Sequence, residues 1–232
     1  MVDKKIANYL SNQGKVAGII QSYASLQAAL RLDSRSLDFF EIRVDCLAGH
    51  EEAVLRQLPK LMLPLIVTVR HPLEGGAHSL SAAKRRECYK KFLPRASLLD
   101  IELRSVKPLA DVIARAQKNK VGIILSYHNF QKTPSLKQLR SLAAAAGKAG
   151  ADIFKVATVV STPADVATLL SLQHSLKMPA SLMGMGKYGK VSRLLFAQGG
   201  SVLNYGFLDK AVVKGQWPAV LLKQRIAELA AG

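Results

Sequence analysis

The sequence predicts a single (β/α)₈ barrel domain covering residues 1–232. Short apolar runs rich in leucine and β-branched residues alternate with longer amphipathic runs, and no linker or low-complexity segment divides them. Eight strand-and-helix units in 232 residues fall at the compact end of the length range of such barrels. A doubly wound open sheet shows the same alternation, and it is the main alternative at this point.

The expected elements follow one another in a regular order, strand then helix, and each spacing suits a βα unit of a parallel sheet. The apolar runs that we expect to be strands are 15–20, 37–45, 64–70, 97–103, 121–128, 151–158, 179–185 and 201–207. Each is followed by an amphipathic run that we expect to be a helix, at 22–30, 51–58, 81–92, 109–118, 136–149, 163–175, 190–197 and 218–230.

Polar residues at the strand ends favour the barrel over the open sheet. In a barrel, reactive side chains gather at the carboxyl ends of several strands, and residues two apart on a strand share one face. The unusual residues of this sequence stand in such positions: Glu41, Arg43 and Asp45; Arg70; Asp100 and Glu102; Ser126 and His128; Lys155; and Met183 with Met185. Solvated edge strands would explain one such case, whereas the repetition indicates a polar pocket inside the mouth of a barrel.

The composition indicates a soluble protein of the cytoplasm. Hydrophobic residues make up 49% and charged residues 21%, which excludes a mainly disordered chain, and no apolar run is long enough to cross a bilayer. Residues 1–15 lack the continuous apolar core of a secretory signal. The two cysteines, Cys46 and Cys88, provide neither a disulfide framework nor the spacing of a metal site.

The charge is the unusual quantity. Lysine and arginine number 33 against 16 aspartate and glutamate, a net charge of +17 that favours anionic partners. A nucleic-acid-binding protein usually concentrates its basic residues near aromatic side chains, whereas here they are scattered and aromatic residues make up 6%. The densest cluster, at 84–91, fits an exposed helix with its charged side toward solvent. We therefore expect a small-molecule substrate, and neither nucleic acid nor a membrane as partner.

The sixth expected strand carries one lysine among apolar residues. Phe154 and Val156 would face the helical layer. Ile153, Lys155 and Ala157 would then face the barrel axis, where desolvation and neighbouring cations would keep the amine neutral part of the time. A neutral lysine attacks carbonyl groups and forms Schiff bases. On this strand alone, a lysine that reaches solvent along its stem remains an equal alternative.

His128 ends the neighbouring strand, so its side chain and that of Lys155 would point to the same mouth. A lysine iminium makes the adjacent C–H acidic, and a nearby histidine can remove that proton and later act as an acid. In the loop after the third strand, Glu74 could hold a histidine in one tautomer, and Gly75 and Gly76 let the loop fold close over a ligand. Alone, that loop is equally consistent with a flexible turn. The other four histidines are expected to be structural.

A formal G-x-G-x-x-G pattern lies within residues 183–193, between an expected strand and an expected helix, and superficially matches a dinucleotide fingerprint. We reject that interpretation because only one strand candidate follows, which is too little chain for half of a dinucleotide-binding fold. In a barrel, the loop after strand seven commonly binds anions, and Arg193 can hold a carboxylate through two hydrogen bonds, or a phosphate. The last loop, with Gly215 and Gln216, is expected to close over the site.

In these motifs the sequence resembles the type I 3-dehydroquinate dehydratase family, from the first expected strand to Gln216. The matching segments are EIRVD at 41–45, Arg70 with EGG at 74–76, SYHNF at 126–130, FKVA at 154–157, MGMG at 183–186 with Ser192 and Arg193, and GQ at 215–216. Each segment is modest alone, and their order and spacing together are specific.

The resemblance implies a (β/α)₈ barrel without cofactor or metal that converts 3-dehydroquinate to 3-dehydroshikimate, the third step of the shikimate pathway to the aromatic amino acids. It implies that Lys155 forms an imine with the C3 ketone, that His128 removes a C2 proton and then protonates the departing C1 hydroxyl in a syn elimination, and that Glu74 pairs with His128. The implied substrate contacts are Arg193 and Gln216 on the carboxylate, Glu41, Arg43 and Arg70 on the ring hydroxyls, and an apolar wall of Met183 and Met185. Family members often form homodimers, so a homodimer is expected.

The last loop departs from the family pattern. Val212 stands where the family often has a serine, and Lys214 replaces a proline, so one substrate hydrogen bond is absent and slower or less ordered lid closure is expected. Two other functions remain open: a class I aldolase with a phosphate site at Arg193 and Lys190, and a binding module that uses the net charge. The arrangement of the histidine and the lysine favours proton abstraction and water loss.

Overall fold

The computed structural model describes residues 14–231, and they form the predicted barrel. The strands are β1 (Lys15–Ile20), β2 (Phe39–Arg43), β3 (Leu65–Thr68), β4 (Leu98–Glu102), β5 (Gly122–Asn129), β6 (Ile153–Val159), β7 (Ala180–Met185) and β8 (Leu203–Phe207). The helices are α2 (Tyr23–Arg31), α3 (Glu51–Gln57), α4 (Ala82–Phe92), α5 (Ala110–Lys118), α6 (Leu136–Lys148), α7 (Pro163–Ser175), α8 (Gly189–Gln198) and α9 (Ala219–Ala230). The interpretation of the leader sequence concerns residues that lie largely outside the described range.

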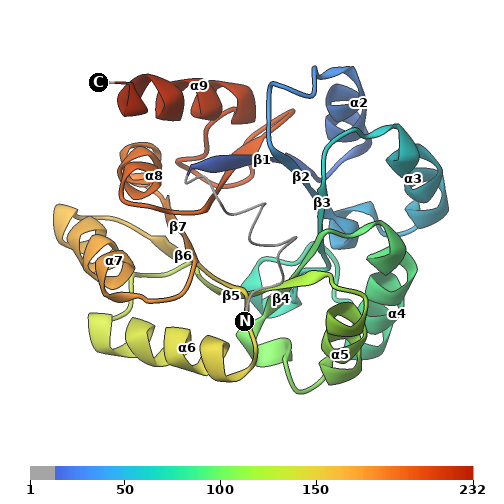
Figure 1. The fold of residues 1–232 in the computed structure, drawn as a ribbon, viewed down its shortest axis with the longest axis horizontal. Coiled ribbons are helices and arrows are strands. Elements are labelled where there is room, and N and C mark those ends of the chain that lie inside the picture. Colours follow the sequence, from blue (N-terminus) through green and yellow to red (C-terminus); the bar gives the residue numbers. More distant parts are fainter. Residues whose placement is uncertain (1–13, 232) are drawn as a thin grey trace.

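The strand order separates the barrel from its rival. The strand pairs of the described residues are all parallel, and the order β7-β6-β5-β4-β3-β2-β1-β8 places β1 between β2 and β8. The seam between β7 and β8 is held by individual hydrogen bonds, including one of 2.9 Å from Val202 N to Ala180 O. The helices surround the ring of strands (Figure 1). The predicted (β/α)₈ barrel is therefore confirmed, and the open sheet is excluded.

Four helices begin where a hydroxyl side chain caps them. Ser22, Ser81, Ser135 and Thr162 each accept a backbone N–H of the first turn of α2, α4, α6 and α7. Strand β2 is shorter than expected because the chain turns into a 3₁₀ helix at Val44–Leu47. Asp45 therefore does not continue the face of β2, which corrects that expectation.

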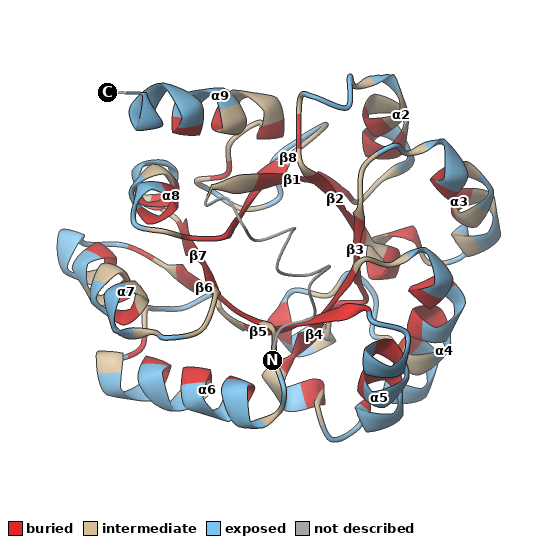
Figure 2. Ribbon diagram, in the orientation of Figure 1, coloured by how far each residue is buried: buried red, intermediate tan, exposed pale blue. Residues whose placement is uncertain are grey.

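The core has two parts, as alternation along the strands requires. Phe154 and Val156 pack in the layer between the strands and the helices, whereas Ile153 and Ala157 pack inside the barrel. The helices bury their inner faces and expose their outer faces (Figure 2). Both orientations of β6 agree with the sequence prediction, so the face that carries Lys155 is the interior one.

The basic cluster at 84–91 does not lie wholly in solvent. Lys84, Lys90 and Lys91 are exposed, but Arg85 is buried and donates to Val69 O at 2.8 Å. It also contacts the carboxylate of Glu102 and the hydroxyl of Ser105. The prediction of a helix with its charged side in water was wrong for this residue, because a guanidinium on the inner face of α4 finds a buried anion.

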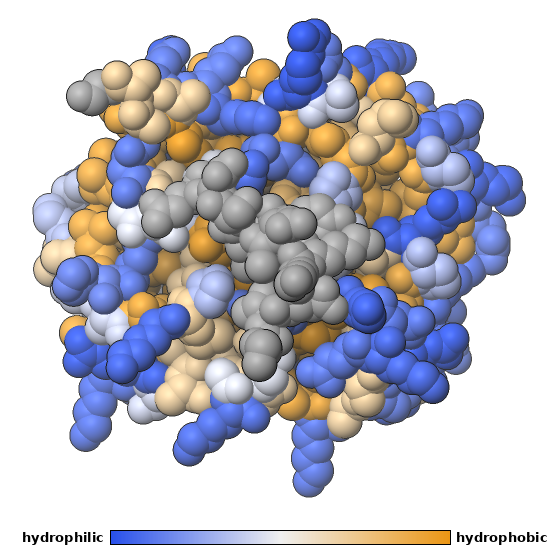
Figure 3. All heavy atoms as spheres, in the orientation of Figure 1, coloured by the Kyte–Doolittle hydropathy of each residue, from blue (hydrophilic) through white to orange (hydrophobic). Residues whose placement is uncertain are grey.

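Hydrophilic side chains are spread around the face shown in Figure 3 and do not gather in one patch. Within residues 14–231, no helix is both long and apolar enough to span a membrane.

Candidate active site

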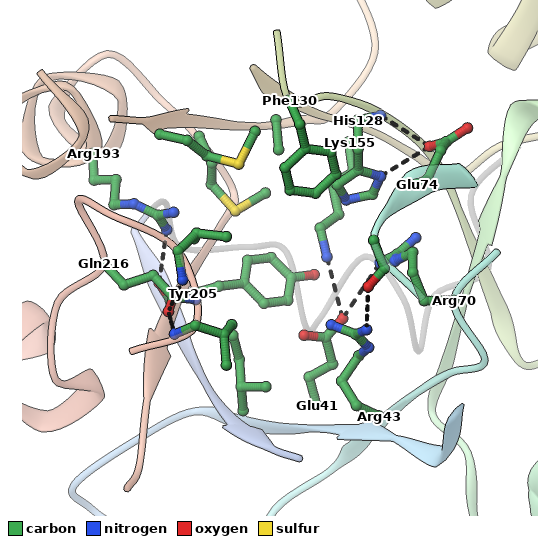
Figure 4. Close-up of a pocket in the computed structure, with 17 residues that line it drawn as sticks. Glu41, Arg43, Arg70, Glu74, His128, Phe130, Lys155, Arg193, Tyr205 and Gln216 are labelled. Carbon is green, nitrogen blue, oxygen red and sulfur yellow. Dashed lines mark hydrogen bonds and ion pairs between the residues drawn. The ribbon is translucent and has the colours of Figure 1, made fainter. Parts of the chain in front are cut away.

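A cavity of about 270 Å³ opens among the loops that follow the carboxyl ends of the strands. It is lined by every residue that the sequence marked as catalytic or substrate-binding: Glu41, Arg43, Arg70, Glu74, His128, Lys155, Met183, Met185, Arg193 and Gln216. Figure 4 shows Lys155, His128 and Glu74 on one side of this cavity and Arg193 with Gln216 on the other. The structure thus brings together side chains from six of the eight strand-and-loop units, which supports their assignment to one site.

Lys155 lies in the cavity wall with only 3% of its surface exposed. Its Nζ donates to Asp100 Oδ2 at 2.7 Å and to Glu41 Oε1 at 3.2 Å. The alternative of a lysine that reaches solvent is therefore excluded. The sequence led us to expect neighbouring cations, and the structure adds two carboxylates that pair with the amine directly. The amine must give up a proton and leave these partners before it can attack a carbonyl.

The two carboxylates are themselves held in place. Glu41 accepts a hydrogen bond of 2.8 Å from the hydroxyl of Thr68 on the adjacent strand β3. Asp100 accepts two hydrogen bonds of 2.9 Å from Arg70, which is the bidentate geometry that fixes a carboxylate best. Burial alone would raise the pKa of Asp100, but Arg70 and Lys155 hold it well below its usual value. The amine therefore faces anions of fixed position.

Arg70 organises this end of the cavity. Besides Asp100, it donates to Glu102 at 3.0 Å and to the hydroxyl of Ser126 at 2.8 Å. Burial would lower the pKa of Arg70, but Asp100 and Glu102 raise it well above its usual value. With Glu102 also paired to Arg85, the buried cations Lys155, Arg70 and Arg85 balance the buried anions Glu41, Asp100 and Glu102. The buried charges of this part of the site therefore balance one another without a ligand.

His128 is oriented by Glu74. The Nδ1 atom of His128 lies 3.0 Å from Glu74 Oε2, and the same oxygen accepts the backbone N–H of His128 at 2.9 Å. Arg104 donates to the other oxygen, Oε1, at 2.9 Å. With Nδ1 protonated toward the carboxylate, the Nε2 atom is left free to act as a base.

The pKa values of Glu74 and His128 are shifted in opposite directions. Burial, reinforced by the negative charge of Glu102, raises the pKa of Glu74 to about 7. Burial, together with the nearby charges of Arg70 and Lys155, lowers the pKa of His128 well below 6.5. His128 is thus neutral near pH 7, where a catalytic base must be unprotonated.

The loop that carries Glu74 is a tight turn closed by backbone hydrogen bonds. Glu74 N and Gly76 N both donate to His71 O, at 2.9 and 3.0 Å. A Cβ on Gly76 would come within 2.5 Å of Arg70 O, so this position accepts no larger residue without a backbone shift. The close turn brings the Glu74 carboxylate back onto β5.

Arg193, on α8, forms the other end of the cavity. Its Nη1 donates to the backbone carbonyl of Tyr205 at 2.9 Å, and the guanidinium is buried. Its Nε has no hydrogen-bond partner among the residues that the structure describes, and no ion pair with a carboxylate is found there. Burial lowers the pKa of Arg193 to about 10. A buried cation without an anion is a ready binding site for a carboxylate.

The last loop is folded over this end. Gln216 Oε1 accepts the backbone N–H of Val212 at 2.8 Å, and Lys214 O accepts that of Gly186 at 2.8 Å. Gly215 lies so close to Gly189 that an added Cβ would come within 2.7 Å of its Cα. The loop is therefore docked on the β7–α8 loop without the proline, and the apolar Val212 side chain lines the cavity where the family often has serine.

Tyr205 is the residue that the sequence analysis missed. Its ring lies 3.7 Å from Lys155 Nζ, measured to the ring centroid, and it lines the cavity. On β8, Tyr205 lies two residues from Leu203 and two from Phe207, so it shares a strand face with them. In the sequence it therefore looks like an ordinary core aromatic residue. Among residues 14–231, no group of three or more His, Cys, Asp or Glu side chains is placed to hold a metal ion.

Comparisons with known proteins agree with this geometry. A model of the family described as type I 3-dehydroquinase matches residues 19–229. The chain is 35% identical over 202 residues to the 3-dehydroquinate dehydratase of Pyrococcus abyssi, covering 87% of this chain and 92% of the relative. It is 32% identical over 199 residues to that of Methanocella arvoryzae, covering 85% and 90%. The crystal structure of 3-dehydroquinate dehydratase from Geobacillus kaustophilus superposes with a TM-score of 0.85 at 25% identity, covering 95% of this chain and 92% of the other.

Proposed function

The chain belongs to the type I 3-dehydroquinase family, and from that premise we propose that it dehydrates 3-dehydroquinate to 3-dehydroshikimate through a Schiff base on Lys155. The enzyme is then a hydro-lyase, and the reaction is the third step of the shikimate pathway. The observation that carries the mechanism is a buried lysine amine that shares one cavity with a neutral histidine and an unpaired arginine.

Imine formation begins at the amine. Once Lys155 Nζ has lost a proton, its lone pair attacks the C3 carbonyl carbon, and the carbonyl π electrons move to oxygen. The resulting carbinolamine loses that oxygen as water, and nitrogen and carbon become doubly bonded as a protonated imine. The cation that this step creates lies beside Glu41 and Asp100, which already balance a positive charge at this position.

Elimination then uses His128. The iminium withdraws electrons from C2, so the neutral imidazole removes a C2 proton and an enamine forms. The imidazolium, stabilised through Nδ1 by Glu74, returns that proton to the C1 hydroxyl, which departs as water from the same side. The electron pair of the enamine forms the new C1–C2 double bond, and water hydrolyses the imine to release the product.

Arg193 holds the substrate by its carboxylate. The free Nε–H and the positive charge suit an anionic oxygen, and the side-chain amide of Gln216 lies at the same end of the cavity. Met183 and Met185 provide an apolar wall, and Glu41, Arg43 and Arg70 meet the ring hydroxyls or organise the groups that do. The carboxylate at one end and the ketone at the other fix C2 near His128.

The reaction is tested by offering 3-dehydroquinate to the purified protein and following ultraviolet absorbance of the conjugated enone. Absorbance should rise with wild-type protein and fail to rise with Lys155→Ala. A folded wild-type protein that produced no absorbance change would contradict the proposal. A class I aldolase would instead cleave a C–C bond of a phosphorylated substrate, but Lys190 lies over the Trp217 ring and does not line the cavity, which counts against a phosphate site.

The role of His128 is tested separately from that of Lys155. His128→Ala should still form a covalent adduct but turn over poorly, because imine formation and elimination are different steps. Full turnover in this variant would remove His128 as the base. The homodimer and the cytoplasmic location that the family resemblance implies remain part of the proposal, and sedimentation at several protein concentrations tests the first.

A further inference from the structure

The hydroxyl of Tyr205 is buried and has no hydrogen-bond partner among the residues that the structure describes. Leaving a buried hydroxyl unpaired costs free energy, and native proteins rarely do so without a reason. A phenylalanine would fill the same space without that cost. The unpaired group therefore points to a partner that arrives with a ligand.

The position of Tyr205 indicates which part of a ligand would accept a hydrogen bond from its hydroxyl. The ring lies against Lys155 Nζ, and Figure 4 shows the hydroxyl directed toward the side of the cavity where Lys155 and Glu41 meet. The backbone carbonyl of Tyr205 accepts from Arg193, so the residue spans the two ends of the cavity. A substrate held by its carboxylate at Arg193 and by its ketone at Lys155 would lie along this side chain.

The hydroxyl keeps its proton in this setting and is therefore available as a donor. Burial raises the pKa of Tyr205 well above 10, and the negative charges of Glu41 and Asp100 act in the same direction. The phenol therefore keeps its proton throughout the working pH range. A proton held in place, without a protein acceptor, is suited to an oxygen that gains negative charge.

We propose that the Tyr205 hydroxyl is a further catalytic group, which donates a hydrogen bond to the ketone oxygen of the substrate while Lys155 attacks the carbonyl carbon. This inference rests on the proposed function and deepens it. The new bond joins nitrogen to carbon, the π electrons move to oxygen, and Tyr205 stabilises that oxygen. His128 takes the first proton of the Lys155 ammonium before the attack. The oxygen takes a second proton from the nitrogen as the new bond forms, and it leaves as water with the proton that the His128 imidazolium returns. Tyr205 itself gives up no proton.

The test separates the hydroxyl from the ring. Wild-type protein, Tyr205→Phe and Tyr188→Phe are mixed with 3-dehydroquinate, quenched with borohydride at increasing times, and analysed for the Lys155 adduct by mass spectrometry. Tyr205→Phe keeps the ring against the amine and should slow adduct formation by about 10²-fold, the usual cost of losing one such donor. Tyr188 is partly buried and lies outside the cavity lining, so Tyr188→Phe should form the adduct at the wild-type rate.

The outcomes distinguish this inference from the function on which it rests. Adduct formation by Tyr205→Phe at the wild-type rate would overturn the role of the hydroxyl and leave the Schiff base intact. A raised KM with an unchanged rate of adduct formation would also overturn it, because the hydroxyl would then only bind the ground state. Failure of the wild-type protein to form an adduct would overturn both. Thermal melting checks that Tyr205→Phe is folded, and a Tyr205→Leu variant, which also removes the ring, should be slower still.

Discussion

At one end of the cavity Lys155 lies between the carboxylates of Glu41 and Asp100, whereas at the other end Arg193 is buried with no carboxylate at all. Both are cations of similar burial in one small space. The first belongs to a network whose charges balance in the free protein, and the second has an open Nε–H. The difference indicates that the side chains at the Lys155 end keep their positions during a reaction. At the Arg193 end, the guanidinium is available to bind an anionic group of a ligand.

Lys155 and Arg193 should also contribute differently to the stability of the fold. Removing a partner from a balanced buried network leaves an uncompensated charge, which is strongly destabilising. Removing a buried charge that has no counterion removes the desolvation free energy that this charge costs the folded state. The same substitution, to methionine, at the two positions should therefore change stability in opposite directions.

Lys155→Met should have the largest effect. Turnover should fall by about 10⁴-fold or more, because no other lysine of residues 14–231 lines the cavity. The melting temperature should fall too, since Glu41 and Asp100 lose a shared cation, with a loss of ~3 kcal/mol as for other broken buried pairs. Enone absorbance and calorimetric melting measure the two effects. A variant as stable as the wild type would mean that the network is not balanced as described.

Arg193→Met should act on binding and not on the chemical step. We expect KM for 3-dehydroquinate to rise by about 10²-fold, because the carboxylate loses a charge-assisted contact. The pKa of Arg193 is lowered to about 10 in the folded state, so its charged form is disfavoured by folding at every pH below that value. Methionine removes this cost, and the melting temperature should rise by about 2–4 °C for ~1 kcal/mol. A fall in melting temperature would contradict the account of this end.

Glu74→Gln should remove the acidic limb from the pH dependence of kcat. With the pKa of Glu74 at about 7, the carboxylate protonates as the pH falls through neutrality, and His128 loses the anion that stabilises its cation. Wild-type kcat should therefore decline below about pH 7. In Glu74→Gln that decline should disappear, with a plateau lower by about 10-fold or more. Persistence of the same limb in the pH profile would assign it to another group.

Arg104→Gln should have the smallest effect. Arg104 is 44% exposed, and its positive charge lowers the pKa of the Glu74 carboxyl, so its loss should move the acidic limb of kcat to higher pH. An exposed ion pair is weak, so we expect a shift of about half a pH unit at low salt and less at high salt. Arg104→Lys keeps the charge and serves as the control. Equal profiles for glutamine and wild type would show that Arg104 has no electrostatic influence on Glu74.

The sequence was sufficient for the barrel and for the set of residues around the cavity. Alternating runs with helical and extended periods predicted all sixteen elements within a few residues, and charged residues two apart at strand ends marked the mouth. His128 and Lys155 were placed on one side because β5 and β6 pair in parallel. These inferences depend on local periodicity, which a single chain displays directly.

The missed features depend on contacts between side chains from different elements of the fold. Tyr205 resembled a core aromatic because nothing near it in the sequence indicates that its hydroxyl is unpaired. Arg85 appeared to be one of many surface cations until Glu102 was found beneath it. The direct pairing of Lys155 with Asp100 joins residues 55 positions apart, and it arises because β4 and β6 both pair with β5. Local patterns therefore predicted where side chains lie, but not which charges would pair.

Borohydride reduction in the presence of 3-dehydroquinate, followed by peptide mass spectrometry, shows directly whether Lys155 forms a Schiff base with the substrate. We expect one new covalent ligand, attached to Nζ of Lys155, in the wild-type protein and in His128→Ala, and none in Lys155→Met. A turning-over enzyme that gave no adduct, or an adduct on any other lysine, would contradict this expectation.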